Sequence, residues 1–374
     1  MAEAFERLQK IQAEDVADLC LGSVFLATGG GGDPYVNQLL TEAALRSHGP
    51  VALVAASALP DAAWVLPLGE VGAPTVSLEQ LPVGDEPLVA LARYESATGR
   101  RVTHLIPFEV GGANSVLPLV AAAARGLPVV DGDGMGRALP EAQMMTFAIA
   151  GVPPTPAVAV DYLGNTVTFD TANVDDYERQ VRHLAIAMGG MIFTAEHGMV
   201  GAHARGCVVP DTLSFAVGLG RLLRQRRGPA KDLLPELEAL FASSSYGILR
   251  HLYTGKVVDI DRRVQGGFDI GEATLAPLRG PGEPLTIAIR NEYLLASCND
   301  RVLASVPDLI VVVDSETATP INAERLAYGQ RVSVLGIGCP GHYRSEPALR
   351  VVGPRCFGFD CDYVPIEDLP AGPG

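Results

Sequence analysis

The residue types best suited to chemistry gather in residues 129–147 (VVDGDGMGRALPEAQMMTF), where two carboxylates directly follow an apolar run. The run predicts a buried strand ending at Asp131 and Asp133. In parallel α/β sheets, ligands bind beyond the carboxyl ends of the strands. Two acids whose surroundings separate their pKa values can serve as general acid and base. We therefore predict that Asp131, Asp133 and Glu141 are catalytic and that Arg137 binds substrate, although Arg137 and Glu141 can equally form a surface pair four residues apart on a helix.

A second polar loop, EVGGANS (109–115), follows the apolar residues of THLIPF (103–108). It places Glu109, Gly112 and Asn114 where a strand ends and a helix begins. If this strand is a neighbour of the strand at 129–130, the polar groups of the two loops converge on one cleft. We predict that Glu109 is catalytic and that Gly112 and Asn114 bind substrate.

A third candidate loop, ATGGGGDP (27–34), separates helices predicted over 14–26 and 36–47. Its free N–H groups can cradle an anion or a polarised carbonyl. A dinucleotide or phosphate loop would need a preceding strand and GxGxxG or GK[ST] spacing, and neither is present. We predict that Thr28, Gly30, Gly31 and Asp33 contact the substrate.

Two histidines, His197 and His203, lie in TAEHGMVGAHARGC with Cys207 four residues later. Imidazole and thiolate are the ligands that zinc prefers, so a divalent metal site is one interpretation. The spacing matches no recognised metal motif, so structural histidines are the alternative. Cys207 is also a weak candidate nucleophile, because a reactive thiol needs a neighbouring base.

The composition narrows the class of protein. The chain has 374 residues, 28 Lys and Arg against 43 Asp and Glu, and a formal net charge of −15. This charge argues against nucleic acid or an anionic membrane as partner, and leaves a small molecule, with a homo-oligomer possible in principle. The N-terminus lacks a signal-peptide core and no apolar stretch is long enough for a membrane span. Six scattered cysteines without a CxxC pair favour a reduced, cytoplasmic setting.

The pattern of elements predicts an α/β fold with two domains. Over residues 1–168, short apolar runs alternate with helical patterns and end in a hairpin at 157–169. We expect an N-terminal three-layer α/β domain there, which carries most of the site. Residues 169–374 begin with a helical segment near 174–242 and continue as short strands, one of them LTIAIRNEYLLAS (285–297). This part predicts a C-terminal, mainly β, barrel-like domain.

Seven motifs then resemble, in order and spacing, the S-methyl thiohydantoin desulfurase family. They are ATGGGGDPY (27–35), GAPTV (72–76), EVGGANS (109–115), DGDGMGRALPEAQM (131–144), GKVVDIDRRVQGGFDIGEA (255–273), VPDLIVVVDSETATPI (306–321) and FGFDCDYVP (357–365). The resemblance covers nearly the whole chain. It implies the same two-domain layout and hydrolysis at C2 of a thiohydantoin ring, with release of methanethiol or sulfide. Such a reaction belongs to the breakdown of sulfur-substituted histidine derivatives such as ergothioneine.

For that reaction we expect Asp131 or Glu109 to activate water, glycine N–H groups to hold the ring carbonyl, and Arg137 to bind a propionate substituent. A bound divalent metal could replace the base. The chain departs from the family pattern at Glu79-Gln80, where Glu-Lys is expected, and we place Glu79 among the substrate-binding residues. Two rival functions remain: a hydrolase of hydantoin or lactam rings that releases no sulfur, and a non-catalytic subunit that binds a cyclic amide for a hydantoinase-type partner.

Overall fold

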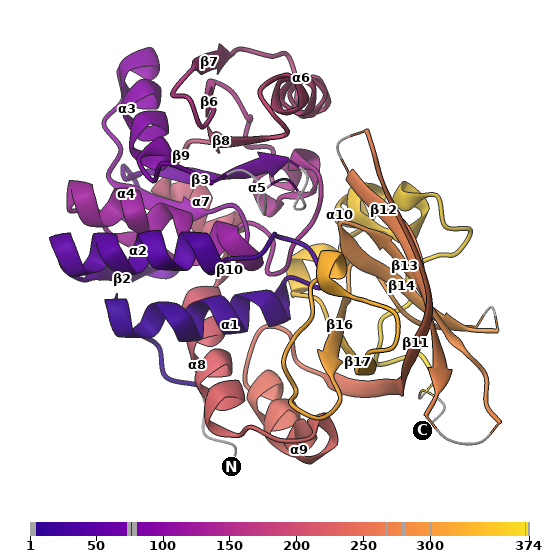
Figure 1. Cartoon of the computed structure of the whole chain (residues 1–374). Coiled ribbons are helices and arrows are strands. Elements are labelled where there is room, and N and C mark those ends of the chain that lie inside the picture. The colour runs from indigo at the N-terminus through magenta and orange to yellow at the C-terminus, as the bar shows by residue number, and fades with distance from the viewer. Residues whose placement is uncertain are drawn as a thin grey trace.

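The chain folds around two β-sheets, as a computed structural model shows. The model describes residues 5–72, 76, 81–266, 268–278, 281–299, 301–370 and 372. Figure 1 shows the α/β part of the molecule beside a curled antiparallel sheet. The predicted fold class is therefore confirmed: an N-terminal α/β sheet with helices is joined to a mainly β part that forms a half-barrel.

The first sheet has the strand order β1-β2-β5-β4-β3-β8-β6-β7, with β10 paired to β5 and β9 to β3. Its strands are β1 (Lys10–Ile11), β2 (Val51–Ala55), β3 (Trp64–Gly72), β4 (His104–Pro107), β5 (Val129–Asp133), β6 (Ala157–Val160), β7 (Thr166–Phe169), β8 (Met191–Ala195), β9 (Met199–Val200) and β10 (Val209–Pro210). Strands β2, β5, β4 and β3 run parallel, and β5 is buried throughout, as expected of a central parallel strand. Strands β4 and β5 are neighbours, so the loops after them emerge at one edge of the sheet.

Nine helices of the described chain belong with this part or connect the two sheets. They are α1 (Val16–Leu26), α2 (Tyr35–His48), α3 (Glu86–Thr98), α4 (Leu117–Arg125), α5 (Thr146–Ile149), α6 (Val174–Ala187), α7 (Gly201–Cys207), α8 (Thr212–Gln225) and α9 (Ala230–Ala242). Glycines let α1 and α8 pack with their backbones almost touching, because a Cβ on Gly22 would lie 1.9 Å from the carbonyl oxygen of Ala216.

The sequence prediction placed residues 169–242 at the start of the second domain, and the structure shows that the first sheet continues through them. Strand β8 pairs with both β3 and β6, and β10 pairs with β5. Helix α6 begins at the cap residue Asn173, whose side chain accepts a hydrogen bond from the Asp176 N–H. In space, the segment from α6 to α8 therefore lies with the α/β part.

The second sheet has the order β15-β14-β13-β12-β11-β17-β16 and is antiparallel throughout. Its strands are β11 (Leu249–Gln265), β12 (Phe268–Pro277), β13 (Leu285–Arg290), β14 (Glu292–Cys298), β15 (Arg301–Ser305), β16 (Leu309–Asp314) and β17 (Arg331–Ile337), and α10 (Glu346–Val352) follows. The single strand expected over 285–297 is wrong. Asn291, at φ +58°, turns the chain so that Arg290 pairs with Glu292 across a tight hairpin.

The two parts share one hydrophobic core. The cluster that packs the first sheet also contains Leu294, Val306 and Leu309 from the second, and a smaller core fills the half-barrel. The apolar contact holds the β13–β14 turn against the α/β part. The site described below lies at this junction.

Candidate functional site

A pocket lies where the end of β3 and the loops after α1, β4 and β5 meet α6, β8 and the β13–β14 turn. Its lining combines three glycines, several apolar side chains and six glutamates. The polar side chains around it belong to Glu70, Glu109, Asn114, Glu141, Glu178, Arg182, Glu196, Asn291 and Glu292, and the backbone of Gly31 and Gly32 also lines it. Of the predicted site residues, the structure brings Gly31, Glu109, Asn114 and Glu141 together here.

Glu109 is buried and held by two donors. The Asn114 side-chain amide donates to its Oε1 at 2.7 Å, and the Leu139 N–H donates to its Oε2 at 3.1 Å. Burial raises the pKa of Glu109 to about 8, although both hydrogen bonds favour the ionised form. A carboxyl group with this pKa exchanges its proton near neutral pH, as a general base or acid must.

Asn114 links Glu109 to a second acid. Its Oδ1 accepts a hydrogen bond of 2.6 Å from the backbone N–H of Glu70. The Glu70 carboxylate accepts a hydrogen bond from Asn37 at 3.2 Å, and burial raises its pKa to about 7. The amide of Asn114 therefore fixes the orientation of Glu109 against β3.

Glu292 enters the pocket from the other part of the molecule, at the tip of the β13–β14 hairpin. Its side chain is 2% exposed, and Oε2 has no hydrogen-bond partner among the described residues. Burial, with the nearby Glu109 charge adding to it, raises the pKa of Glu292 well above its ordinary value. The loop backbone lies against this side chain, because a Cβ on Gly30 would lie 2.1 Å from Glu292 Oε1.

The glycine-rich loops pack directly on one another. Gly31 (φ +69°) and Gly112 (φ +58°) touch so closely that a Cβ on Gly112 would lie 2.1 Å from the Gly31 carbonyl oxygen. The Ala113 N–H donates to the same oxygen at 2.8 Å, and the Tyr293 N–H donates to the Thr28 carbonyl at 2.6 Å. These contacts hold Gly31 at the wall of the pocket, with the predicted residues Gly30 and Gly112 packed beside it.

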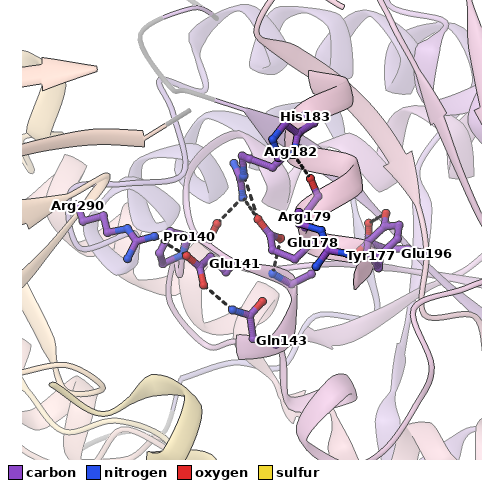
Figure 2. A network of polar contacts seen from close by, with 11 residues as sticks. Pro140, Glu141, Gln143, Tyr177, Glu178, Arg179, Arg182, His183, Glu196 and Arg290 are labelled. Atoms are coloured by element: carbon purple, nitrogen blue, oxygen red, sulfur yellow. Dashed lines mark hydrogen bonds and ion pairs between the residues drawn. The ribbon is translucent and has the colours of Figure 1, made fainter. Parts of the chain in front are cut away.

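Two ion pairs lie at the pocket, and Figure 2 shows both of them. Arg290 pairs with Glu141 at 2.5 Å, so Glu141 has an inter-domain partner and does not pair with Arg137. Arg182 pairs with Glu178 at 2.8 Å and donates to the Pro140 carbonyl at 2.6 Å. Burial raises the pKa of Glu178, with Arg182 opposing the shift.

Glu196 also lines the pocket and is fully buried. Its Oε2 accepts a hydrogen bond from the Tyr177 hydroxyl, and its Oε1 lies 3.3 Å from Nδ1 of His197 without hydrogen-bond geometry. His197 is also fully buried, at φ +52°, and neither ring nitrogen has a hydrogen-bond partner among the described residues. Unpaired buried polar atoms of this kind are uncommon and mark a place where water or a ligand is expected.

The histidine pair does not assemble a metal site within the described part of the chain. His203 is exposed on α7, whereas His197 is buried. No group of three or more His, Cys, Asp and Glu side chains in that part is arranged to hold an ion. The residues present therefore do not fit the zinc site, and we derive no chemical step through a metal. Burial raises the pKa of the Cys207 thiol to about 12, which disfavours its use as a nucleophile.

Asp131 and Asp133 lie at the end of β5 as expected, but their oxygens are occupied by the protein itself. Asp131 accepts two hydrogen bonds from Ser214, at 3.0 Å from its N–H and 2.6 Å from its hydroxyl. Asp133 Oδ2 accepts three backbone N–H groups, and its Oδ1 accepts the Thr212 hydroxyl at 2.9 Å. Neither side chain lines the pocket, and both hold the backbone around it in place through these hydrogen bonds.

Arg137 also lies outside the pocket. Its guanidinium is fully buried and donates to the carbonyl oxygens of Pro307 and Asp308 and to the Thr28 hydroxyl, at 2.8–2.9 Å. It joins the two parts of the molecule. Asp33 accepts the Tyr35 N–H at 3.0 Å and pairs with Arg325, also across the junction.

Glu79 lies outside the described residues. No helix among the residues described has the length and apolar character that crossing a membrane requires.

Family comparison agrees with this architecture. Residues 14–171 match the S-Me-THD-like N-terminal domain, and residues 172–366 match the S-Me-THD-like C-terminal domain. The chain belongs to the S-Me-THD-like family. This is the S-methyl thiohydantoin desulfurase family that the sequence motifs resemble.

A crystal structure of a protein from Chromobacterium violaceum has the same fold, with a TM-score of 0.78 and 23% identity over 96% of this chain and 99% of that one. Curated proteins gave no match.

Sequence reasoning missed half of the pocket of this S-Me-THD-like protein. The missed residues come from two strands, a helix and a loop without a recognisable motif: Glu70, Glu178, Arg182, Glu196 and Glu292. A usable signal existed for Glu292 alone: the residue before it, Asn291, interrupts the alternation of LTIAIR, and asparagine tolerates positive φ.

Proposed function

We propose that this chain hydrolyses a thiohydantoin-type ring at C2 and replaces sulfur by oxygen. The observation that carries the proposal is the pair Glu109 and Glu292, two buried carboxyl groups that approach one pocket from the two parts of the molecule. Membership of the S-Me-THD-like family supports an enzyme acting on such a ring.

The different surroundings of the two acids assign their roles. Glu109 has two donors that stabilise its ionised form, so it is the base that takes a proton from water. Glu292 keeps its proton, because burial and the Glu109 charge both oppose its ionisation, so it is the acid. Two carboxyl groups whose surroundings separate their pKa values are a general means of acid–base catalysis at neutral pH.

In the reaction, the oxygen of water bonds to C2 as Glu109 accepts a proton. Glu292 then protonates sulfur as the C2–S bond breaks and the C2 carbonyl forms. With an S-methyl substrate, one hydrogen of water ends on methanethiol and the other on the ring nitrogen; with a thioxo substrate both end on hydrogen sulfide. We assign the ring carbonyl to the backbone N–H groups of the loop at Gly31 and Gly32, because these two residues line the pocket.

The test is release of thiol and sulfide from 2-thiohydantoins and their S-methyl forms. We expect turnover by the wild-type protein and a loss of about 100-fold or more in Glu109→Gln and Glu292→Gln. Glu346→Gln is the matched control, because Glu346 is an exposed residue of α10 with a side chain 78% exposed. Wild-type turnover retained by either pocket variant would contradict the assigned roles.

The same assay separates the rival functions. Ring opening without sulfur release would identify a hydrolase of hydantoin or lactam amides. Tight binding of the ring without any chemical change would identify a non-catalytic subunit. Either result would overturn the desulfurase proposal.

A further inference from the structure

Several buried polar atoms without a hydrogen bond lie in one short segment, at the end of β8 and directly after it. Among the residues that the structure describes, they are Oγ1 of Thr194, Oε1 of Glu196 and both ring nitrogens of His197. Glu196 belongs to the lining of the pocket. Because a buried polar group left unpaired is costly, these atoms indicate a place prepared for a polar group of a ligand.

Two neighbours hold the carboxyl group of Glu196 in position. The Tyr177 hydroxyl of α6 donates to Oε2. Burial, with the Glu196 charge adding to it, raises the pKa of Tyr177 well above its ordinary value, so the hydroxyl keeps its proton and remains a donor. Nδ1 of His197 lies 3.3 Å from Oε1. His197 has φ +52°, a backbone conformation uncommon outside glycine, and its N–H donates to the Pro154 carbonyl at 3.0 Å.

This arrangement leaves Oε1 of Glu196 able to accept a hydrogen bond from a ligand. An ionised carboxylate offers about four lone-pair sites on its two oxygens. Tyr177 uses one site on Oε2, and His197 can use one on Oε1. A further N–H group can therefore bind Oε1 without displacing either neighbour.

The other acceptors around the pocket have partners within the protein. Glu141 pairs with Arg290. Glu178 pairs with Arg182 in the same way. The side-chain oxygen of Asn114 accepts a backbone N–H of β3 at 2.6 Å.

Three carboxyl groups of the lining remain beside Glu196. Glu70 accepts the side-chain amide of Asn37 at 3.2 Å. Glu109 and Glu292 are assigned to the chemical step. Outside this pair, Glu196 is the carboxyl group of the described lining that has a buried oxygen without a hydrogen bond.

A thiohydantoin ring carries N–H groups at N1 and N3, and the S-methyl form keeps one of them. A ring N–H that enters the pocket needs an acceptor there. We propose that Glu196 is a substrate-binding residue whose Oε1 accepts a ring N–H, with Tyr177 and His197 as positioning residues. The inference rests on the proposed function for the identity of the ring, but it concerns binding and can be tested without turnover.

The test is calorimetric binding of hydantoin propionate and of its 1-methyl and 3-methyl derivatives to the wild-type protein. These rings have the N–H groups of the thiohydantoin but no sulfur to lose, and the common substituent cancels in the comparison. We expect at least one methylated compound to bind about tenfold or more weakly than the unmethylated ring. A smaller difference for both methylated compounds, or no binding of the unmethylated ring, would overturn the inference.

Glu196→Ala removes the acceptor and leaves room for a methyl group. We expect this variant to bind the unmethylated ring at least about tenfold more weakly than the wild type, and to show no penalty for methylation. A penalty that persists would overturn the inference. Glu346→Ala is the matched control, because this side chain of α10 is 78% exposed, and it should bind as the wild type does. If Glu196→Ala does not fold, Tyr177→Phe with Glu196→Leu replaces both partners of their hydrogen bond by apolar groups, with the same expected pattern.

His197→Asn tests the positioning role. Asparagine tolerates positive φ, so the backbone can be kept while the imidazole is removed. We expect the preference for the unmethylated ring to fall by at least about threefold, with binding of the methylated compound unchanged. Equal weakening of all the compounds, or an unchanged preference, would overturn the positioning role of His197.

Sulfur release from 2-thiohydantoin propionate separates this inference from the proposed function. The expected binding pattern without sulfur release would retain the inference and refute the desulfurase. Sulfur release with a methyl penalty that persists in Glu196→Ala would do the reverse.

Discussion

Replacement of Asp133 separates a structural from a catalytic role for one of the acids that the sequence predicts to be catalytic. Its Oδ2 accepts the N–H groups of Val110, Met135 and Gly136 at 2.7–3.1 Å, and its Oδ1 accepts the Thr212 hydroxyl. Alanine would leave three buried N–H groups unpaired, at about 1–3 kcal/mol each. We expect Asp133→Ala to lower the free energy of unfolding by about 3–9 kcal/mol, a large share of the 5–15 kcal/mol typical of a protein.

Asparagine at the same position is the matched variant. Its amide oxygen can accept the same three N–H groups, and its NH₂ can donate to the Thr212 hydroxyl oxygen, so shape and most hydrogen bonds are kept. We expect Asp133→Asn to cost about 1 kcal/mol in urea unfolding and to change turnover less than about threefold. The reasoning is refuted if Asp133→Asn abolishes turnover with unchanged unfolding, or if Asp133→Ala unfolds like the wild type.

Three further predictions follow from the buried charges. Turnover should rise with pH through about 8, as Glu109 loses its proton, and Glu109→Gln should remove this rise; a profile flat from pH 6 to 9 would argue against Glu109 as base. In the folded protein, burial raises the pKa values of Glu70 and Asp133 to about 7 and that of Glu109 to about 8. These groups therefore stabilise the fold at low pH, and this stability is lost as pH rises through 7–8. Urea midpoints should therefore be lower at pH 9 than at pH 6, and equal midpoints would contradict the burial of these acids. Arg137→Met should cost about 3–5 kcal/mol in unfolding, because it strips the donors from three acceptors at the junction, and a loss below about 1 kcal/mol would show that the guanidinium does not join the two parts.

The fold could be predicted because it depends on patterns that are local in sequence. Alternating strands and helices predicted the parallel strands β4 and β5, and their adjacency places the loop of Glu109 beside the loop of Asp133. The contacts of each polar atom could not be predicted, because they depend on partners far away in the chain. Asp131 follows its strand as an active-site acid would, yet Ser214 occupies both of its oxygens.

The same reasoning explains the residues that were missed. Glu292 depends on a turn centred on one residue, Asn291, inside an otherwise regular apolar run. Glu178 and Glu196 belong to a helix and a loop that were assigned to the other domain, because the sequence gives no direct sign that β8 returns to the first sheet.

The tight turn at Asn291 makes the position of Glu292 depend on the strand pairing of the half-barrel. The backbone of Arg290 lies opposite that of Glu292 in the hairpin. The pairing of β13 with β14 therefore sets the position of the Glu292 carboxyl group. A slip of one residue in a strand moves its side chains to the opposite face of the sheet. Substitutions in the half-barrel that alter strand pairing, even far from the pocket, would therefore reduce the rate of the reaction before they unfold the protein.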